Sequence, residues 1–420
     1  MYLLRYICPL TGQPLCDRMW IMKRLVIVKF HEPALKGKNR PMFIRRLASN
    51  LRRAIKGTRV QSVWQAHMMI CMSLHEDADW DAIRRRVGDC MGVAKFYLAM
   101  RVAPNLEAVR ALLRDELPKH RFDTFRITAH RTNKRFPVKS DAINREMGAF
   151  VEKITGATVR LNDADLEIFI DVVNDGMLVY FDPIQGYGGM PVDSSGETMA
   201  LMSGGIDSPV AAWQMMRRGS RVKMVHFHSH PLVDSSSMEK AAELAEILTR
   251  YQYDAELFLV PFAGVQQRII VDVPPPYRVL LYRRFMVRIA EALARQQGIA
   301  ALVTGESLAQ VASQTLENIA IVDAAAQMPI LRPLIGSNKN DIVDTARQIG
   351  TFPISIIPDQ DCCSLFVPRH PVTKGSAKVV ERLEDALPVD ELVEQALDGV
   401  EVREFAFSGV RYSRDKSTTA

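Results

Sequence analysis

The residues best suited to carry out chemistry lie in one short segment, Ser203-Gly-Gly-Ile-Asp-Ser208. The apolar run before it, Thr198 to Met202, predicts a strand, and residues 209 to 218 after it predict a helix. Glycines allow backbone N–H groups to approach the oxygens of an anion, and a helix N-terminus adds partial positive charge. The two serine hydroxyls can donate to phosphate oxygens, and Asp207 can hold a cation beside them. We therefore expect this segment to bind phosphate groups.

Two common phosphate-binding patterns do not fit this segment. A Walker A loop needs Lys followed by Ser or Thr after its last glycine, and the dinucleotide fingerprint needs Gly-x-Gly-x-x-Gly. The segment instead resembles the pyrophosphate-binding loop (PP-loop) of ATP pyrophosphatases, which split ATP between its α and β phosphates. An ordinary strand-to-helix turn is the alternative. The coincidence of two glycines, two serines and an aspartate in this context favours the phosphate loop.

Strands and helices alternate around this loop. The predicted strands are 198–202, 222–228, 256–261 and 301–304, and the predicted helices are 209–218, 237–251 and 278–296. This alternation predicts a parallel sheet with helices on both faces, whose ligands bind at the carboxyl ends of the strands. Ser203, His226 and Gly305 all lie at such ends.

The front half of the chain mixes strands and helices in an α+β pattern. Strands are expected at 25–30, 94–100, 124–130, 167–173 and 177–181, and helices at 42–56, 106–117 and 140–154. The helix at 42–56 has one apolar side and one arginine-rich side. A glycine-rich stretch, residues 186–196, predicts a linker, and residues 1–21 predict a disordered lead or a misassigned start.

Composition and charge restrict the class of protein. The 420 residues are 48% hydrophobic and 24% charged, as in globular proteins, and the apolar runs are of strand length. Because no signal peptide or membrane span is evident, we expect a cytoplasmic protein with no membrane partner. The net charge of +6 is modest, so the distribution of basic residues matters more than their sum.

Basic residues gather in two segments that suit contact with a nucleic acid backbone. One holds Lys36, Lys38, Asn39 and Arg40, and the other holds Arg131, Lys134 and Arg135. Basic side chains in loops with glycine and asparagine suit phosphate contacts. The arginines of the helix at 42–56 fit a solvated helix face equally well.

Cysteines and histidines offer less specific signals. Six cysteines are scattered apart from the adjacent pair Cys362 and Cys363, and no spacing suits zinc. His226, His228 and His230 alternate along a predicted strand and so share one face, which leaves open either a metal site or a single nucleotide contact.

Further motifs give the chain a clear resemblance to a known family. These motifs are Leu35-Lys-Gly-Lys-Asn-Arg, Arg131-Thr-Asn-Lys-Arg-Phe-Pro, Ser203-Gly-Gly-Ile-Asp-Ser-Pro-Val-Ala, Val225-His-Phe-His-Ser and Gly305-Glu-Ser-Leu-Ala-Gln-Val-Ala-Ser-Gln. The chain resembles the tRNA uridine 4-sulfurtransferases (4-thiouridine synthetases) from about Met22 to beyond His370.

The resemblance implies an order of domains. An N-terminal extension (1–21) would precede a ferredoxin-like domain (22–78) and a THUMP RNA-binding domain (79–185), both α+β. After the linker would come an α/β PP-loop domain with a parallel sheet (197–405) and a short tail (406–420).

The resemblance also implies a reaction. ATP would adenylate O4 of the uridine at position 8 of tRNA and release pyrophosphate. Sulfur carried as a cysteine persulfide would then displace AMP from C4. Mg²⁺ would screen the phosphates and stabilise the departing pyrophosphate.

Site residues follow position by position from the same resemblance. Asp207 matches the residue that holds Mg²⁺ and pyrophosphate, and Lys339 matches a lysine important for activity. The sulfur carrier falls at Cys362 or Cys363, between which the motif does not decide. The implied ATP-binding residues are Leu201, Met202, Ser203, Gly204, Gly205, Ser208, His226, Phe227, Arg283, Gly305 and Gln314.

One departure from the family concerns sulfur delivery. Some members end in a rhodanese domain with its own cysteine, whereas no cysteine follows Cys363 here. We therefore expect sulfur to come from a cysteine desulfurase or another persulfide donor, and the sequence leaves a homodimer open. The alternative functions are a PP-loop ligase acting on a different RNA base or small substrate, and a non-catalytic RNA-binding protein.

Overall fold

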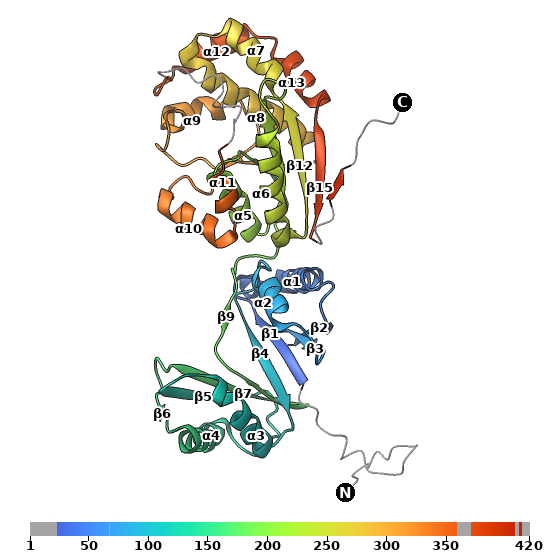
Figure 1. Ribbon diagram of the computed structural model, residues 1–420, viewed down its shortest axis with the longest axis vertical. Helices are drawn as coiled ribbons and strands as arrows, with labels where there is room; N and C mark the ends of the chain where they lie inside the picture. The colour runs from blue at the N-terminus through green and yellow to red at the C-terminus, as the bar shows by residue number, and fades with distance from the viewer. Residues whose placement is uncertain (1–22, 67, 359–370, 408–410, 414–420) are drawn as a thin grey trace, which may run out of the picture. The chain divides into compact units, whose positions relative to one another are not determined.

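The computed structural model describes residues 23–66, 68–358, 371–407 and 411–413, which form two compact units (Figure 1). The first unit holds residues 23–30 with Ile55–Gly88 and Ala94–Gly186. The second holds His31–Ala54, Asp89–Val93 and the residues from Tyr187 onward. Residues 1–21, expected to be a lead segment, and Cys362 and Cys363 lie outside the described residues.

A mixed sheet with helices forms the first unit. Its strands are β1 (Lys23–Lys29), β2 (Val60–Ala66), β3 (Met69–Leu74), β4 (Lys95–Val102), β5 (Thr124–Arg131), β6 (Thr158–Val159), β7 (Leu166–Val173), β8 (Gly176–Tyr180) and β9 (Ile184–Gln185). The order is β2-β3-β1-β4-β8-β7-β5-β6, with β9 beside β4. The helices are α2 (Trp80–Gly88), α3 (Leu106–Glu116) and α4 (Ser140–Thr155).

Local sequence explains where two of these helices begin and end. The side chain of Asn105 accepts a hydrogen bond from the backbone N–H of Ala108, which caps the start of α3. Gly156 adopts a left-handed conformation (φ 74°) and ends α4, a conformation that glycine reaches without strain. Val109 and Leu113 of α3 pack with Met147 of α4 in one core, at helical spacing. The helices predicted at 106–117 and 140–154 are thereby confirmed.

The second unit is built on a largely parallel sheet. Its strands are β10 (Glu197–Leu201), β11 (Arg221–His228), β12 (Asp254–Pro261), β13 (Leu302–Val303), β14 (Ile330–Leu331), β15 (Glu401–Ala406) and β16 (Arg411–Ser413). The order is β14-β13-β10-β11-β12-β15-β16, and the strands from β14 to β12 are parallel. The parallel sheet was predicted, whereas the antiparallel pairing of β15 with β12 was not.

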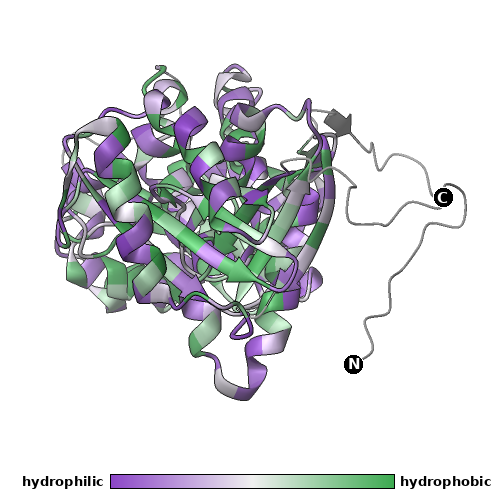
Figure 2. Cartoon of the chain, turned by 90° about the horizontal axis from the view of Figure 1, so that it is seen from below, coloured by the Kyte–Doolittle hydropathy of each residue, from purple (hydrophilic) through white to green (hydrophobic). Residues whose placement is uncertain are grey.

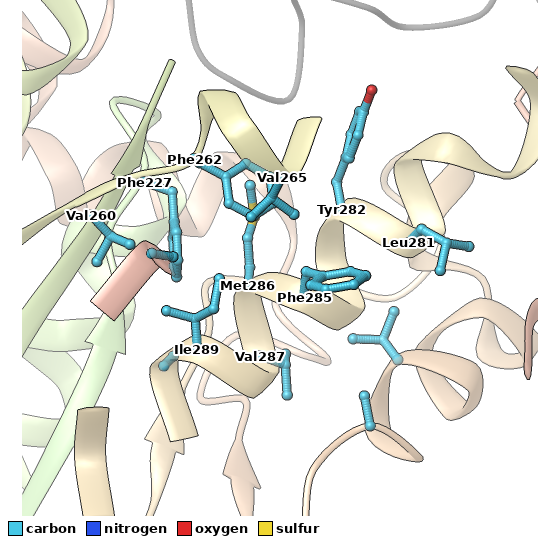
Figure 3. Close-up of a cluster of buried hydrophobic side chains, with 14 of the residues drawn as sticks. Phe227, Val260, Phe262, Val265, Leu281, Tyr282, Phe285, Met286, Val287 and Ile289 are labelled. Atoms are coloured by element: carbon cyan, nitrogen blue, oxygen red, sulfur yellow. The ribbon is translucent and has the colours of Figure 1, made fainter. Parts of the chain in front are cut away.

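Helices cover both faces of this sheet, as predicted. They are α5 (Asp207–Arg217), α6 (Ser236–Gln252), α7 (Ala263–Asp272), α8 (Arg278–Gln296), α9 (Leu316–Asp323), α10 (Lys339–Ile349), α11 (Phe352–Ser355), α12 (Ala377–Asp385) and α13 (Val389–Asp398). One core joins α7, α8, α12 and α13 to the sheet through residues such as Phe227 and Phe262, which Figure 3 shows in one cluster with Phe285 and Met286 of α8. A second core joins α5, α6 and α10 to the opposite face through Met224, Leu257 and Val303. This unit also contains the helix α1 (Arg40–Ala54).

The surface helices combine hydrophilic and hydrophobic residues, which Figure 2 shows as purple and green segments along the same ribbon. In α1 the buried positions include Phe43, Leu47 and Leu51, four residues apart. None of the helices in the described ranges combines the length and the apolar composition that a membrane span requires.

Candidate active site

The Ser203–Ser208 loop joins the end of β10 to the start of α5 and is held together by its own serines. The hydroxyl of Ser208 accepts a hydrogen bond from the backbone N–H of Ser203 (2.9 Å) and lies 3.1 Å from the Ser203 carbonyl oxygen. The hydroxyl of Ser203 accepts from the backbone N–H of Gly205 (3.2 Å). These bonds fix the loop in a tight turn at the N-terminus of α5, where backbone dipoles favour an anion.

Gly305 brings the end of β13 against the first turn of α5. A Cβ atom at this position would lie 2.7 Å from the backbone N of Ser208 and 2.8 Å from the carbonyl carbon of Asp207. Backbone atoms cannot yield as the tip of a flexible side chain can, so the close approach requires glycine.

Both carboxylate oxygens of Asp207, the first residue of α5, are engaged. Oδ1 forms an ion pair with Nζ of Lys339 (2.5 Å), and Oδ2 accepts a hydrogen bond from Nε2 of Gln310 (2.8 Å). Lys339 is the first residue of α10, so two helix N-termini meet at this pair. Asp207 and Lys339 were predicted as site residues from the sequence, whereas Gln310 was not, although it lies in the motif that begins at Gly305.

A cavity of about 180 Å³ opens beside the loop, at the carboxyl ends of the parallel strands. Apolar side chains, among them Phe227, Met286 and Val287, form one part of its wall, and Figure 3 shows all three in the core around α8. The full lining comprises Leu201, Met202, Ser203, Asp207, Ser208, Phe227, Arg283, Met286, Val287, Thr304, Gly305, Glu306, Gln314, Val322 and Arg332. A flat aromatic base suits the apolar wall, and phosphates suit the loop.

Most of the predicted nucleotide residues meet in this cavity. Leu201, Met202, Ser203, Ser208, Phe227, Arg283, Gly305 and Gln314 all line it, together with Asp207. Gln314 is 6% exposed, and its Oε1 has no hydrogen-bond partner among the described residues. An amide oxygen buried in this way needs a donor from a bound molecule or water, because an unpaired polar group is costly.

Four predicted residues are outside the cavity lining. Lys339 reaches the cavity through its pair with Asp207, and Gly204 and Gly205 belong to the loop itself. His226 is 1% exposed and bonds the carbonyl oxygen of Met202 (3.0 Å) and the hydroxyl of Ser237 (3.3 Å). These bonds give His226 a role in fixing the end of β10.

The alternating histidines do not form a metal cluster in the described part of the chain. No group of three His, Cys, Asp or Glu side chains with metal-binding geometry occurs there. The rings of His228 and His230 lie 6.5 Å apart. Burial, followed by the neighbouring His226 and His230, lowers the pKa of His228 to about 4, so His228 is neutral at physiological pH.

Sequence reasoning missed a charged group in the wall of the cavity. Glu306 is 6% exposed and accepts hydrogen bonds from Arg283, from Nε of Arg332 (2.7 Å) and from the hydroxyl of Thr304 (2.9 Å). Burial alone would raise the pKa of Glu306, but Arg283 and Arg332 together lower it. The signal in the sequence was a charged residue directly after Gly305 at a strand end.

The predicted RNA-binding residues lie in different units. In the second unit Lys36, Lys38 and Asn39 are exposed, and Nε of Arg40 donates to the carbonyl oxygen of Ala34 (2.9 Å). In the first unit Lys134 and Arg135 are exposed.

Arg131 differs from these exposed residues. Its guanidinium donates to the carbonyl oxygens of Phe136 (2.9 Å) and Val138 (3.2 Å) and so closes the loop that presents Lys134 and Arg135. The arginines of α1 are also partly committed, because Arg46 and Arg53 pair with Asp193.

Cys362 and Cys363 lie outside the described residues, and described residues on either side are anchored to the second unit. Before the cysteines, Nζ of Lys240 donates a hydrogen bond to the carbonyl oxygen of Ile357 (2.5 Å). The hydroxyl of Ser355 donates to the carbonyl oxygen of Gly205 (3.4 Å). After them, Nδ2 of Asn318 donates to the carbonyl oxygen of Val372 (2.9 Å). Gly205 belongs to the phosphate loop, so one of these anchors is part of the site.

Family models match most of the chain. The model described as "Thiamine biosynthesis protein (ThiI)" matches residues 193–389, "ThiI ferredoxin-like domain" matches 25–97, and "THUMP domain" matches 106–182. These matches confirm the expected fold class of a ferredoxin-like, a THUMP and a PP-loop part. The domain boundaries expected from the sequence stay predictions.

Relatives that match over nearly their whole length indicate the same family as the family models. The chain is 49% identical over 389 residues to a protein of Thermus thermophilus named "Probable tRNA sulfurtransferase", covering 92% of this chain and 96% of that protein. A protein of the same name from Moorella thermoacetica is 38% identical, with 90% and 96% covered. A solved 4-thiouridine synthetase–RNA complex with bound ATP is 33% identical with a TM-score of 0.83, covering 91% of this chain and 99% of that chain. The chain belongs to the tRNA sulfurtransferase family.

Proposed function

We propose that this protein is an ATP-dependent tRNA sulfurtransferase that converts the uridine at position 8 of tRNA to 4-thiouridine. The observation that carries the proposal is the Asp207–Lys339 pair, which stands at the N-terminus of α5 beside the phosphate loop and the cavity. The relatives carry the name of this activity, and the solved relative contains both RNA and ATP.

The first half of the reaction activates an oxygen that is otherwise a poor leaving group. O4 of the uridine attacks the α-phosphorus of ATP, the bond to the β-phosphate breaks, and pyrophosphate leaves. The loop of Ser203–Ser208 holds the phosphates at the positive end of α5, and Lys339 neutralises charge that develops in the transition state.

Asp207 is the residue that fits Mg²⁺ at this site. Mg²⁺ binds through one or two carboxylates together with phosphate oxygens and water, and does not need a cage of protein ligands. The carboxylate of Asp207 lies beside the phosphate loop, and no three-ligand cluster occurs among the residues that the structure describes. When bound, the ion would supply positive charge to the departing pyrophosphate.

The second half of the reaction exchanges oxygen for sulfur. The outer sulfur of a persulfide on Cys362 or Cys363 attacks C4, and AMP leaves with O4, which joins the nucleoside to the cysteine through an S–S bond. A second thiol, from a thiol reductant, then attacks the cysteine sulfur, so the S–S bond breaks, 4-thiouridine leaves and the cysteine remains in a disulfide with that thiol. The anchors on either side of this cysteine pair support the assignment, because Ser355 contacts the loop and Asn318 lies on α9, which also carries the cavity residue Val322. A cysteine desulfurase or another persulfide donor supplies the sulfur.

The tRNA is bound by exposed basic residues in both units. Lys36, Lys38, Asn39 and Arg40 belong to the unit with the cavity, and Arg131 shapes the loop that presents Lys134 and Arg135. Their side chains would contact phosphates of the backbone. A tRNA substrate is in keeping with a cytoplasmic location.

Pyrophosphate release from ATP in the presence of tRNA tests the proposal. Asp207→Ala should abolish both release and thiolation while tRNA binding persists, because the carboxylate is not part of the basic segments. Asp344→Ala, which removes an exposed carboxylate of α10, is the matched control and should behave as the wild type. Full activity of Asp207→Ala, or binding of tRNA with no pyrophosphate release by the wild type, would refute the assignment.

A further inference from the structure

A carboxylate in the wall of an anion-binding cavity needs an explanation, because it repels phosphate. Glu306 lines the cavity, and its side chain is only 8% exposed. Its two oxygens have different partners: Oε1 accepts from Nη1 of Arg283, and Oε2 accepts from Nε of Arg332 and from Thr304. All three partners line the same cavity.

The arrangement continues outward as a chain of alternating charges. Arg332 is 10% exposed at its side chain, and its Nη2 also pairs with Oδ1 of Asp323 (2.5 Å). The guanidinium of Arg332 is thus held on two sides, and Glu306 is held by Arg332. Both arginines line the cavity, and Arg283, with a side chain 23% exposed, is the more accessible of the two and has no second carboxylate partner in the chain of charges.

Geometry makes Glu306 the element that orients Arg283. A guanidinium is planar and offers five N–H donors in a fixed fork, so anchoring one of them fixes the direction of the others. The anchor holds only if the carboxylate is ionised, and the two arginines lower the pKa of Glu306. A pre-oriented donor binds its ligand without paying again for the loss of rotamer freedom.

We propose that Glu306 is a positioning residue for nucleotide binding, which acts by holding the guanidinium of Arg283 toward the anionic part of ATP. The inference rests on the proposed function only in taking ATP as the ligand of the cavity. Both carboxylate oxygens of Glu306 are already engaged by Arg283, Arg332 and Thr304, so its effect on the nucleotide passes through Arg283.

The chain provides a closely matched control for this proposal. Glu384 of α12 is 4% exposed and also bridges two arginines, Arg284 (3.0 Å from Nε to Oε1) and Arg288 (2.8 Å from Nη2 to Oε2). Arg284 follows Arg283 directly on α8, yet Glu384 is not part of the cavity lining. Glu384→Gln therefore makes the same chemical change at the same depth of burial, away from the ligand.

Calorimetric titration with α,β-methylene-ATP, which cannot be cleaved, measures the effect directly. Glu306→Gln should raise the Kd by about tenfold, the size expected for a lost charge-assisted contact, and should raise the KM for ATP with little change in kcat. Glu384→Gln should leave the Kd unchanged. Arg283→Met should also weaken binding, and adding Glu306→Gln to it should have almost no further effect, since the two residues act as a unit.

Three outcomes would overturn the proposal: an unchanged Kd for Glu306→Gln, equal losses for Glu306→Gln and Glu384→Gln, or additive losses in the double variant. If Glu306→Gln does not fold, Glu306→Asp keeps the buried charge but is too short to bridge both arginines, and it should still weaken binding. An unchanged Kd in that variant would equally contradict the proposal. Because binding of the analogue needs no tRNA or sulfur, failure here is distinguishable from failure of the proposed reaction.

Discussion

Asp207 and Glu306 are both acidic residues of one cavity, but their environments give them different roles. Asp207 stands at a helix N-terminus, partly open, and meets one lysine and one amide. Glu306 is buried between two arginines. A carboxylate that remains accessible can take a cation and a changing ligand, whereas an enclosed one can only fix its neighbours.

Gly305 gives a prediction about close packing at the site. Gly305→Ala should destabilise the protein by about 1–3 kcal/mol and weaken ATP binding, because the new Cβ would meet the backbone of α5. Gly336→Ala is the control, since nothing lies within 4 Å of a Cβ at that position. Thermal unfolding and analogue titration measure both effects. Equal behaviour of the two variants would show that α5 moves away easily.

The buried thiols give a prediction about reactivity. Burial raises the pKa of Cys71 to about 11 and that of Cys90 to about 12, and the Tyr253 hydroxyl donates a hydrogen bond to Cys90. At about pH 8 both are protonated thiols and should resist iodoacetamide in the folded protein. Mass spectrometry of tryptic peptides would locate the label. Labelling of Cys90 without prior denaturation would contradict this environment.

Residue roles could be predicted only in part from the sequence. Asp207 and Ser203 follow a local loop pattern, and Gly305 follows a strand of the same predicted parallel sheet, so their meeting in one cavity was foreseeable. The inward bonds of His226 and the pairing of Glu306 with Arg332 depend on contacts between distant segments. No local period or spacing encodes such contacts.

At the level of elements, α8 links the cavity to the outer helices. It carries Arg283 toward the cavity and Arg284 and Arg288 toward Glu384 of α12. Burial alone would raise the pKa of Glu384, but its hydrogen bonds and charges from the two arginines lower it. The bridge therefore attaches α12 to α8 in a charge-dependent way.

This bridge makes stability depend on pH in a defined direction. Because the folded state lowers the pKa of Glu384 below its ordinary value of 4.5, its contribution is fully present above about pH 4.5 and is lost as the pH falls further. Glu384→Gln should cost roughly 3 kcal/mol at neutral pH and should flatten the acid limb of the stability curve. Chemical unfolding at about pH 7 and about pH 4 gives both values. An unchanged acid limb in the variant would assign the effect to other carboxylates.

Helices and strands with a strong hydrophobic pattern were predicted closely from the sequence. Strands that exist because they pair with a neighbouring strand were not. The helix predicted at 278–296 coincides with α8, and the strand predicted at 222–228 with β11 but for one residue. By contrast, β13 is only two residues long and is a strand because it pairs with β10 and β14. The antiparallel β15 likewise depends on its pairing with β12.

On the scale of the molecule, the two units divide the expected tasks. The second unit contains the complete cavity and the basic segment at Lys36–Arg40, and the first contains the segment at Arg131–Arg135. The sequence could assign these segments to RNA by their residue types. It could not show that residues His31–Ala54 pack with the second unit, because that follows from distant contacts such as the bond from Asn50 to Val192.

Salt dependence of tRNA binding tests the basic segment at Lys36–Arg40. Lys36→Ala with Lys38→Ala should weaken tRNA binding and reduce the slope of log K against log salt by roughly one for each lost phosphate contact. Lys378→Ala, an exposed lysine of α12, is the control and should keep the wild-type slope. Filter binding over a salt series provides the slopes. If the double variant keeps its slope, this segment does not contact RNA.

Mass spectrometry of tRNA nucleosides tests the central claim most directly. Cells that lack the protein should contain no 4-thiouridine, and the nucleoside should return with the wild-type protein but not with Asp207→Ala. Asp344→Ala should restore it as fully as the wild type. A normal level of 4-thiouridine in cells without the protein, or with only Asp207→Ala, would contradict the claim that ATP cleavage at this loop drives tRNA thiolation.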